Sequence, residues 1–268
     1  VGRVVLRTAT ADVLPMQFGS FADAIGTYVE EIRRTAEEKR RTSEELSKLL
    51  DQNAFTVAAD PTRLLLPPAR QPEVPYFEFA ALDNVVVRLK KSAKAYDELY
   101  ARFAAGSIKL GAAQRKELDE LLRGIEQTLT DSRGLPGRDW YRHLIYAPGT
   151  LTGYGAKTLP GVREGIEQDR FEEASRYIPI TASVLRAYCD RLDRAAAVLK
   201  RADTGAAPPK GASVPGAPRL AHGPELVKSS ASAQPVAFAA ATATRPAAPV
   251  KHVFLIVLEN HSYTDIVG

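Results

Sequence analysis

Apolar side chains recur at every third or fourth position along most of the first two hundred residues, a spacing that places them on one face of an α-helix. The first strong stripe follows Ser20 and Asp23, which approximate a helix capping box and predict that a helix begins there. The stripe predicts one long amphipathic helix and comprises Phe21, Ile25, Tyr28, Val29, Ile32, Ala36, Leu46, Leu49 and Leu50. Such a helix cannot bury its apolar face alone, so it must pack against others.

Further stripes predict the partners of this helix. They cover residues 82–103 with a terminating Gly106, residues 118–129, a short segment at 161–170, and residues 185–199 in a helix entered near Pro179. The connection between the first two of these stripes is short, so we expect those two helices to pack antiparallel. Residues 58–76 hold five prolines and predict a non-helical connection. The fold class predicted is all-α, with a four-helix-bundle-like domain over residues 16–201.

The two ends of the chain have a different character. Residues 3–14 form a short apolar segment stopped by Pro15, and Val1 stands within what reads as a helix, so we expect a sequence truncated at the front. Residues 202–250 are rich in Ala, Pro, Gly and Ser with few large apolar side chains, which predicts a disordered linker. Within residues 251–268, the run HVFLIVL at 252–258 predicts one isolated apolar strand.

Composition excludes several classes of function. The 36 Lys and Arg against 32 Asp and Glu give a mixed surface despite the net charge of +4, so we expect no nucleic-acid binding. No apolar run approaches the eighteen or so residues of a membrane span. The one cysteine, Cys189, lies in an apolar helical pattern, which favours a packed side chain over a nucleophile.

The histidines argue against metal catalysis in this chain. Only His143, His222, His252 and His261 exist, and no two have metal-ligand spacing with an acidic partner, so no zinc site is expected within residues 1–201. For His143 we expect hydrogen bonds that hold a loop. The adjacent pairs Glu30 and Glu31, and Glu172 and Glu173, are interpreted as surface charges on helices. No catalytic residue is therefore nominated.

Residues 134–148, GLPGRDWYRHLIYAP, form an aromatic-rich loop between predicted helices. Residues 131–199 resemble the C-terminal helical, transferrin receptor-like dimerisation domain of the glutamate carboxypeptidase and transferrin receptor family, most strongly at 134–148 and 154–161, and residues 3–32 resemble the point where the zinc peptidase domain of that family ends and this helical domain begins. The resemblance implies that residues 16–201 form a homodimer and that residues 1–15 are the end of a truncated zinc peptidase domain. It also implies that the catalytic glutamate and the zinc ligands lie upstream, so the chain itself holds no cofactor and a missing peptidase domain is a partner. The usual location of proteins in this family favours a periplasmic or secreted location for this chain.

In the peptidases of this family, the helical domain lends a loop to the substrate pocket, and the resemblance places that loop at residues 146–161. Glutamate-selective members carry an adjacent lysine and tyrosine there, which hold the terminal carboxylate of the substrate. This chain has Tyr154 but Gly153 in the lysine position, which puts glutamate selectivity in doubt. Lys157 is a candidate replacement, although an exposed, solvated lysine is the favoured interpretation, and Tyr154 serves either substrate contact or loop packing. The expected scaffold of the loop is Tyr141, Arg142, His143 and Tyr146.

Residues 251–268 carry a second resemblance, to the opening strand of the phosphoesterase family that includes phospholipase C-like enzymes and acid phosphatases. It implies that Glu259 and Asn260 are metal ligands, but only if a complete phosphoesterase domain followed.

The direct role expected of the chain is self-association without catalysis. Val87, Tyr96, Tyr100 and Phe103 are candidates for a two-fold interface, because apolar positions beyond the needs of one bundle are commonly buried between subunits. Three alternatives remain open: part of an active carboxypeptidase, part of a phosphoesterase whose catalytic domain lies outside this chain, or a noncatalytic receptor-like relative.

Overall fold

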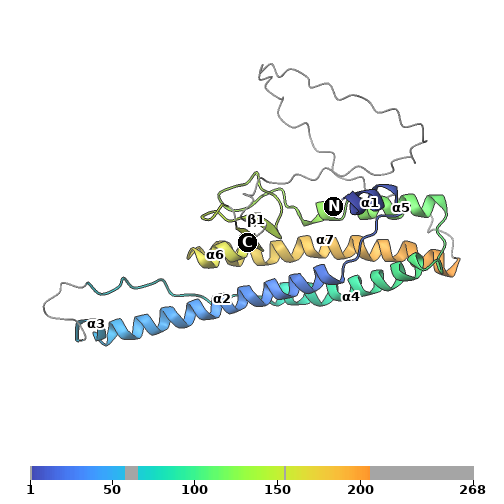
Figure 1. The fold of residues 1–268 in the computed structure, drawn as a ribbon. Coiled ribbons are helices and arrows are strands. Elements are labelled where there is room, and N and C mark those ends of the chain that lie inside the picture. The colour runs from blue at the N-terminus through green and yellow to red at the C-terminus, as the bar shows by residue number, and fades with distance from the viewer. Residues whose placement is uncertain (1, 58–65, 154, 206–268) are drawn as a thin grey trace, which may run out of the picture. The chain divides into compact units, whose positions relative to one another are not determined.

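The computed structural model describes residues 2–57, 66–153 and 155–205 (Figure 1). The chain divides into two units, residues 1–15 with 208–268, and residues 16–207. The described part of the first unit contains one helix, α1 (Gly2–Thr10), in which no residue is buried. The predicted linker lies outside the described residues from 206 onward, as does the whole segment 251–268.

Three long helices form the centre of the second unit (Figure 1). They are α2 (Gly19–Asp51), α4 (Ala80–Ala104) and α7 (Phe171–Thr204), and α4 packs against both of the others. Their apolar stripes are buried as predicted, with Ile25, Ile32, Leu82, Leu89, Leu185 and Leu192 each fully inaccessible. The predicted fold class is therefore confirmed, because helices dominate the described residues and the amphipathic faces meet in one core.

The short helices α5 (Ala112–Arg123) and α6 (Pro160–Glu167), with the 3₁₀ turn η1 (Glu126–Leu129), complete this unit. Both helices pack against α7. The expected antiparallel pair of α4 and α5 is wrong: α5 contacts α7 instead, on the side away from α4 in Figure 1. The physical reason is that α7 has buried side chains on more than one face, so it can be covered from two sides.

Helix α7 begins eight residues before the predicted entry at Pro179. A proline inside a helix removes one hydrogen bond and clashes with the preceding turn. Here Tyr177 and Ile178 before it, and Ile180 after it, are all buried. Apolar burial on both sides therefore outweighs the local cost, and the sequence-based boundary was wrong.

The beginning of α2 was predicted well, but its cap was not. The helix begins at Gly19, and no side chain of its own first turn caps it. Instead, the carboxylate of Asp97 on α4 accepts hydrogen bonds from the backbone N–H groups of Phe18 and Gly19, each at 2.9 Å. The Ser20 and Asp23 pattern therefore predicted the start of α2 well, but the side-chain cap on which that prediction rested is not formed.

The proline-rich connection is non-helical at residues 66–79, as predicted, after the single turn α3 (Ala54–Val57). It is held to α2 by Arg40, whose guanidinium donates to the carbonyls of Val74 at 3.3 Å and Pro75 at 2.8 Å and stacks over the ring of Tyr76 at 3.8 Å. The hydroxyl of Ser43 donates to the carbonyl of Pro72. Residues 72–76 are therefore an ordered strap along α2.

Tyr96 was predicted at a two-fold interface, and this is wrong. Its side chain is fully buried, its ring packs edge-on to Phe18 at 5.1 Å, and it stacks with Tyr100 at 5.9 Å. Tyr100 and Phe103 are half-buried, whereas Val87 is 71% exposed. Of the four candidates, only Val87 presents most of its side chain to solvent.

Candidate functional site

The loop between η1 and α6 contains a small hairpin that was not expected. Strands β1 (Tyr146–Pro148) and β2 (Ala156–Thr158) are antiparallel, with Tyr146 opposite Thr158 and Ala147 opposite Lys157. The segment before the hairpin is joined to η1 by a hydrogen bond from Leu144 N to Leu129 O, and to the residues after η1 by one from Asp131 N to Arg142 O. The described part of the predicted pocket loop 146–161 thus contains this hairpin, and of its predicted contact residues Tyr154 lies outside the described residues.

His143 organises the entry to this hairpin. Its Nδ1 accepts from the backbone N–H groups of Ile145 at 3.3 Å and Tyr146 at 3.2 Å, and its Nε2 lies 3.1 Å from a carboxylate oxygen of Glu126. Since Nδ1 is an acceptor, Nε2 carries the proton of the neutral ring and donates to Glu126. Both ring nitrogens have protein partners, so this imidazole positions the backbone.

The other scaffold residues contribute unequally. The ring of Tyr146 stacks on His143 at 6.0 Å, and its hydroxyl lies 3.4 Å from that of Tyr28 on α2. Burial, and then the hydrogen bond with Tyr28, raise the pKa of Tyr146. The guanidinium of Arg138 lies 5.9 Å from the ring centroid of Tyr141, while Arg142 is exposed and contributes its backbone carbonyl. Tyr146 and His143 therefore connect the hairpin to η1 and α2.

The described residues at the tip of the hairpin, 149–153 and Gly155, are held by backbone hydrogen bonds. Gly149 N donates to Gly155 O, and Gly153 N donates to Gly149 O, both at 2.9 Å. Gly153 has a φ of +65°, which a lysine in its place would adopt only with strain. Leu151, at the tip, is 82% exposed. The turn is therefore closed by its own backbone and presents an apolar side chain outward.

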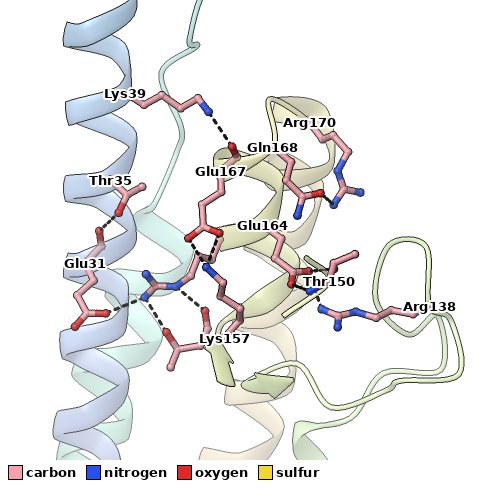
Figure 2. A network of polar contacts seen from close by, with 12 residues as sticks. Glu31, Thr35, Lys39, Arg138, Thr150, Lys157, Glu164, Glu167, Gln168 and Arg170 are labelled. Carbon is pink, nitrogen blue, oxygen red and sulfur yellow. Dashed lines mark hydrogen bonds and ion pairs between the residues drawn. The ribbon is translucent and has the colours of Figure 1, made fainter. Parts of the chain in front are cut away.

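A buried carboxylate on α6 accepts hydrogen bonds from this turn. Glu164 on α6 is only 2% exposed, and it accepts hydrogen bonds from both the backbone N–H and the hydroxyl of Thr150, each at 2.9 Å (Figure 2). Arg138 Nη2 donates to the same carboxylate at 2.7 Å, while its Nη1 donates to the carbonyl of Pro148. Two loops, 134–141 and 148–150, thus converge on one side chain.

A second ion pair connects strand β2 of the hairpin to α6. Lys157 forms an ion pair with Glu167 at 2.7 Å, and its side chain is 28% exposed. The interpretation of Lys157 as a merely solvated lysine is therefore wrong, because the ammonium group already has a carboxylate partner. A free cation for a substrate carboxylate is correspondingly absent from this position in the described part of the loop.

Two glutamates interpreted as surface charges also belong to ion pairs. Glu31 on α2 pairs with Arg163 at 2.8 Å, and Arg163 further donates to both oxygens of Thr158 on β2. Glu173 pairs with Arg170. The Arg163 contacts join α2, α6 and β2, whereas the Arg170 contact lies within the start of α7, so for these two glutamates the surface interpretation was incomplete.

Sequence reasoning missed the residues that order the loop, above all Arg138 and Glu164. A signal was present, because Gly161 and Gly165 flank Glu164 four residues apart. A Cβ at Gly161 would lie 2.3 Å from the Tyr177 ring, and one at Gly165 would lie 2.8 Å from Ala174 N. This closeness of α6 to α7 helps to explain why Glu164 is buried.

The described side chains do not fit a metal ion. Among residues 2–57, 66–153 and 155–205, no three His, Cys, Asp or Glu side chains are grouped to hold one. Cys189 is fully buried, and burial raises the pKa of its thiol to about 11. No helix in the described ranges is long and apolar enough to cross a bilayer. Glu259 and Asn260 lie outside the described residues.

Comparison with known proteins finds a matching family. Residues 77–193 match the family described as "Transferrin receptor-like dimerisation domain". The chain is 46% identical over 57 residues to a "Probable glutamate carboxypeptidase" of Arabidopsis thaliana, which covers 21% of this chain and 8% of the relative. It is 41% identical over 64 residues to one of Arthroderma benhamiae, covering 24% of this chain and 9% of the relative.

The aligned part of the chain thus spans less than a tenth of the length of these curated relatives. The family match ends at residue 193 and gives no support to the phosphoesterase resemblance of residues 251–268. It begins before α4 and ends within α7, so it includes the hairpin and the Glu164 network. From residue 77 to residue 193, this chain is therefore similar to the transferrin receptor-like dimerisation domain.

Proposed function

We propose that the helical unit of this chain is a homodimerisation module of a glutamate carboxypeptidase-like protein, without catalytic activity of its own. The observation that carries the proposal is the family match over residues 77–193. The two relatives support the peptidase context, since both are described as probable glutamate carboxypeptidases. In this proposal, zinc is held by a separate peptidase domain, because the described side chains offer no cluster for it.

Val87 is the side chain best suited to probe the contact. It lies on α4 between the buried residues Val85 and Leu89, yet it is 71% exposed. An isolated exposed valine needs no explanation by itself. On a helix within the matched dimerisation region, however, it is a reasonable point at which to test for burial by a second copy.

The test is sedimentation velocity of the full chain over a wide concentration range. We expect a concentration-dependent dimer that Val87→Lys weakens about tenfold or more, because a charge placed in a desolvated contact is costly. Val57→Lys is the matched control, since Val57 is 84% exposed on α3, outside the matched region. A monomer at every concentration would refute the proposal. A dimer that both variants leave unchanged would place the interface elsewhere.

We propose as a second role that residues 146–161 are presented to the substrate pocket of the peptidase domain. The supporting observation is that the turn is closed by backbone hydrogen bonds and held by Glu164, while Leu151 stays 82% exposed. An ordered loop with an outward apolar tip is suited to contact something outside itself. Its only cation within the described positions, Lys157, is paired with Glu167, so the loop offers little attraction for an anionic side chain.

The second role is tested in a polypeptide that carries both the peptidase domain and this chain. Leu151→Asp should raise KM for a peptide with an apolar C-terminal residue while leaving the dimer intact, because it changes only an exposed tip. Val57→Lys again serves as control. Equal kinetics for Leu151→Asp and the unmodified protein would remove the loop from the substrate pocket.

A further inference from the structure

The hydrogen-bond donors to Glu164 belong to two loops rather than to the helical core. Thr150 N and Thr150 Oγ1 donate to its carboxylate, and Arg138, which also donates to it, reaches the carbonyl of Pro148 with its other terminal nitrogen. Thr150 immediately precedes the exposed tip residue Leu151. The network therefore acts on the position of the turn 149–153 relative to residues 134–141.

Both charges of this network are buried. The side chains of Arg138 and Glu164 are 11% and 3% exposed, and the Nε of Arg138 is buried without a hydrogen-bond partner. Burying two charges has a large desolvation cost, so such a pair commonly stabilises a fold no better than apolar side chains of the same size. Its distinctive contribution is directional, because a guanidinium and a carboxylate fix several hydrogen bonds in one geometry.

The loop on the Arg138 side is itself anchored. Tyr177 on α7 donates a buried hydrogen bond of 2.7 Å to the carbonyl of Gly134, and Arg138 lies in a tight turn with Tyr141 N donating to Arg138 O. Gly134 has a φ of +67°, and a Cβ there would lie 2.1 Å from the carbonyl oxygen of Asp139. Arg138 thus extends from a fixed support toward the turn.

From these contacts we propose that Arg138 and Glu164 form a latch that fixes the turn 149–153, which carries the exposed Leu151, to the anchored loop 134–141, which carries the exposed Trp140. Trp140 is 74% exposed and lies two residues after Arg138. The two latch residues are positioning residues, because they act through Thr150 and Pro148. Their importance for a substrate rests on the proposed role of residues 146–161, whereas the latch itself is a property of this chain.

The latch makes a prediction that a merely stabilising ion pair does not. Replacing both members with apolar side chains of similar size, Arg138→Met with Glu164→Leu, removes the desolvation cost together with the attraction, so the melting temperature should stay near that of the unmodified chain. The hydrogen bonds to Thr150 and Pro148 are lost in this double variant. The turn should then move freely although the helices remain folded.

The experiment measures amide hydrogen exchange at Thr150 and the fluorescence anisotropy of Trp140, which is the only tryptophan of the chain. In the full chain with the double substitution, we expect exchange at Thr150 to rise about ten- to hundredfold, because hydrogen bonds to charged groups contribute that much. Anisotropy of Trp140 should fall, and far-UV circular dichroism should be unchanged. Glu164→Gln keeps the shape of the side chain and should show a smaller rise.

A matched control is Arg201→Met with Glu117→Leu, an ion pair at 2.9 Å between α7 and α5 that contacts neither loop. It should leave both local signals unchanged. Wild-type protection at Thr150 in the latch variant would overturn the inference, as would exchange and melting temperature that change together in every variant. Because these measurements need neither substrate nor dimer, a monomeric chain would refute the proposed function and leave the latch standing.

Discussion

Asp97 and Gly19 are 78 residues apart in sequence, yet a carboxylate oxygen of Asp97 accepts the backbone N–H of Gly19 at 2.9 Å, at the first residue of α2. The other carboxylate oxygen accepts from Phe18 N. The first N–H groups of a helix have no partner within the helix, and a negative charge there also complements the helix dipole. Helix α4 therefore supplies the cap that α2 lacks in its own sequence.

Asp97→Ala should consequently lower the free energy of unfolding by about 1–2 kcal/mol, the usual cost of losing a helix cap. Urea denaturation followed by circular dichroism measures this difference. Glu98→Ala is the control, because Glu98 is the adjacent residue on α4 and only reaches Lys94 at 3.9 Å across an exposed surface. Equal losses in the two variants would show that the cap contributes nothing specific.

Two helical glycines should respond oppositely to an added methyl group. A Cβ at Gly161 would lie 2.3 Å from the ring of Tyr177, so Gly161→Ala must displace α6 or that ring and should destabilise the fold by about 1–3 kcal/mol. A Cβ at Gly26 would meet the flexible end of Lys90 at 3.3 Å. Gly26→Ala should be neutral or stabilising by up to about 1 kcal/mol. The melting temperatures of both variants, measured by thermal unfolding, test this prediction. A higher melting temperature for Gly161→Ala would contradict the packing described for α6.

Arg40 should control the order of the strap at residues 72–76. Arg40→Lys keeps the charge but cannot donate to Val74 O and Pro75 O together or stack flat on Tyr76. We expect faster cleavage by trypsin after Arg70, which lies just before the strap. Arg41→Lys is the control, since the Arg41 side chain is 73% exposed. Identical cleavage rates in both variants would show that the strap is held by other contacts.

The helices could be predicted because each has a repeating apolar face, and a repeat of three and four positions is visible without knowledge of any partner. The same pattern does not say which helix covers which. Thus α5 was expected on α4, whereas it packs on α7, whose buried residues extend around more than one face. The start of α7 was missed because Pro179 was taken as the helix boundary, although the buried apolar residues before it belong to the same helix.

The loop network could not be predicted from local sequence, because its members are far apart and each looks unremarkable alone. Arg138 and Glu164 are 26 positions apart, and Glu31 and Arg163 are 132 apart. A glutamate on a short helix is usually solvated, and only the close approach of α6 to α7 at its glycines makes Glu164 buried. His143 was easier, since its place between an arginine and apolar residues in a loop suggested a hydrogen-bonding role.

Cys189 gives the chain a measurable sensitivity to alkali. Burial raises the pKa of its thiol from 9.0 to about 11, so in the folded state the proton is held while the unfolded chain releases it at lower pH. The contribution of this group to stability is therefore fully present below pH 9 and is lost as pH rises from about 9 to about 11. Burial also raises the pKa values of Tyr96 and Tyr188 above their ordinary value of 10.0, so their contributions are lost from about pH 10 upward and overlap the upper part of this range.

Cys189→Ala should reduce the loss of stability between pH 9 and 11 by up to about 2 kcal/mol, and the loss that remains from about pH 10 upward belongs to Tyr96 and Tyr188. The measurement is urea unfolding of both proteins at pH 7, 9 and 11, compared by slope, because the substitution also removes a buried side chain at every pH. In parallel, the native thiol should not react with Ellman's reagent at pH 8 until urea unfolds the chain. Rapid reaction of the folded protein would show that solvent reaches Cys189. The buried position of this side chain on α7 would then be wrong.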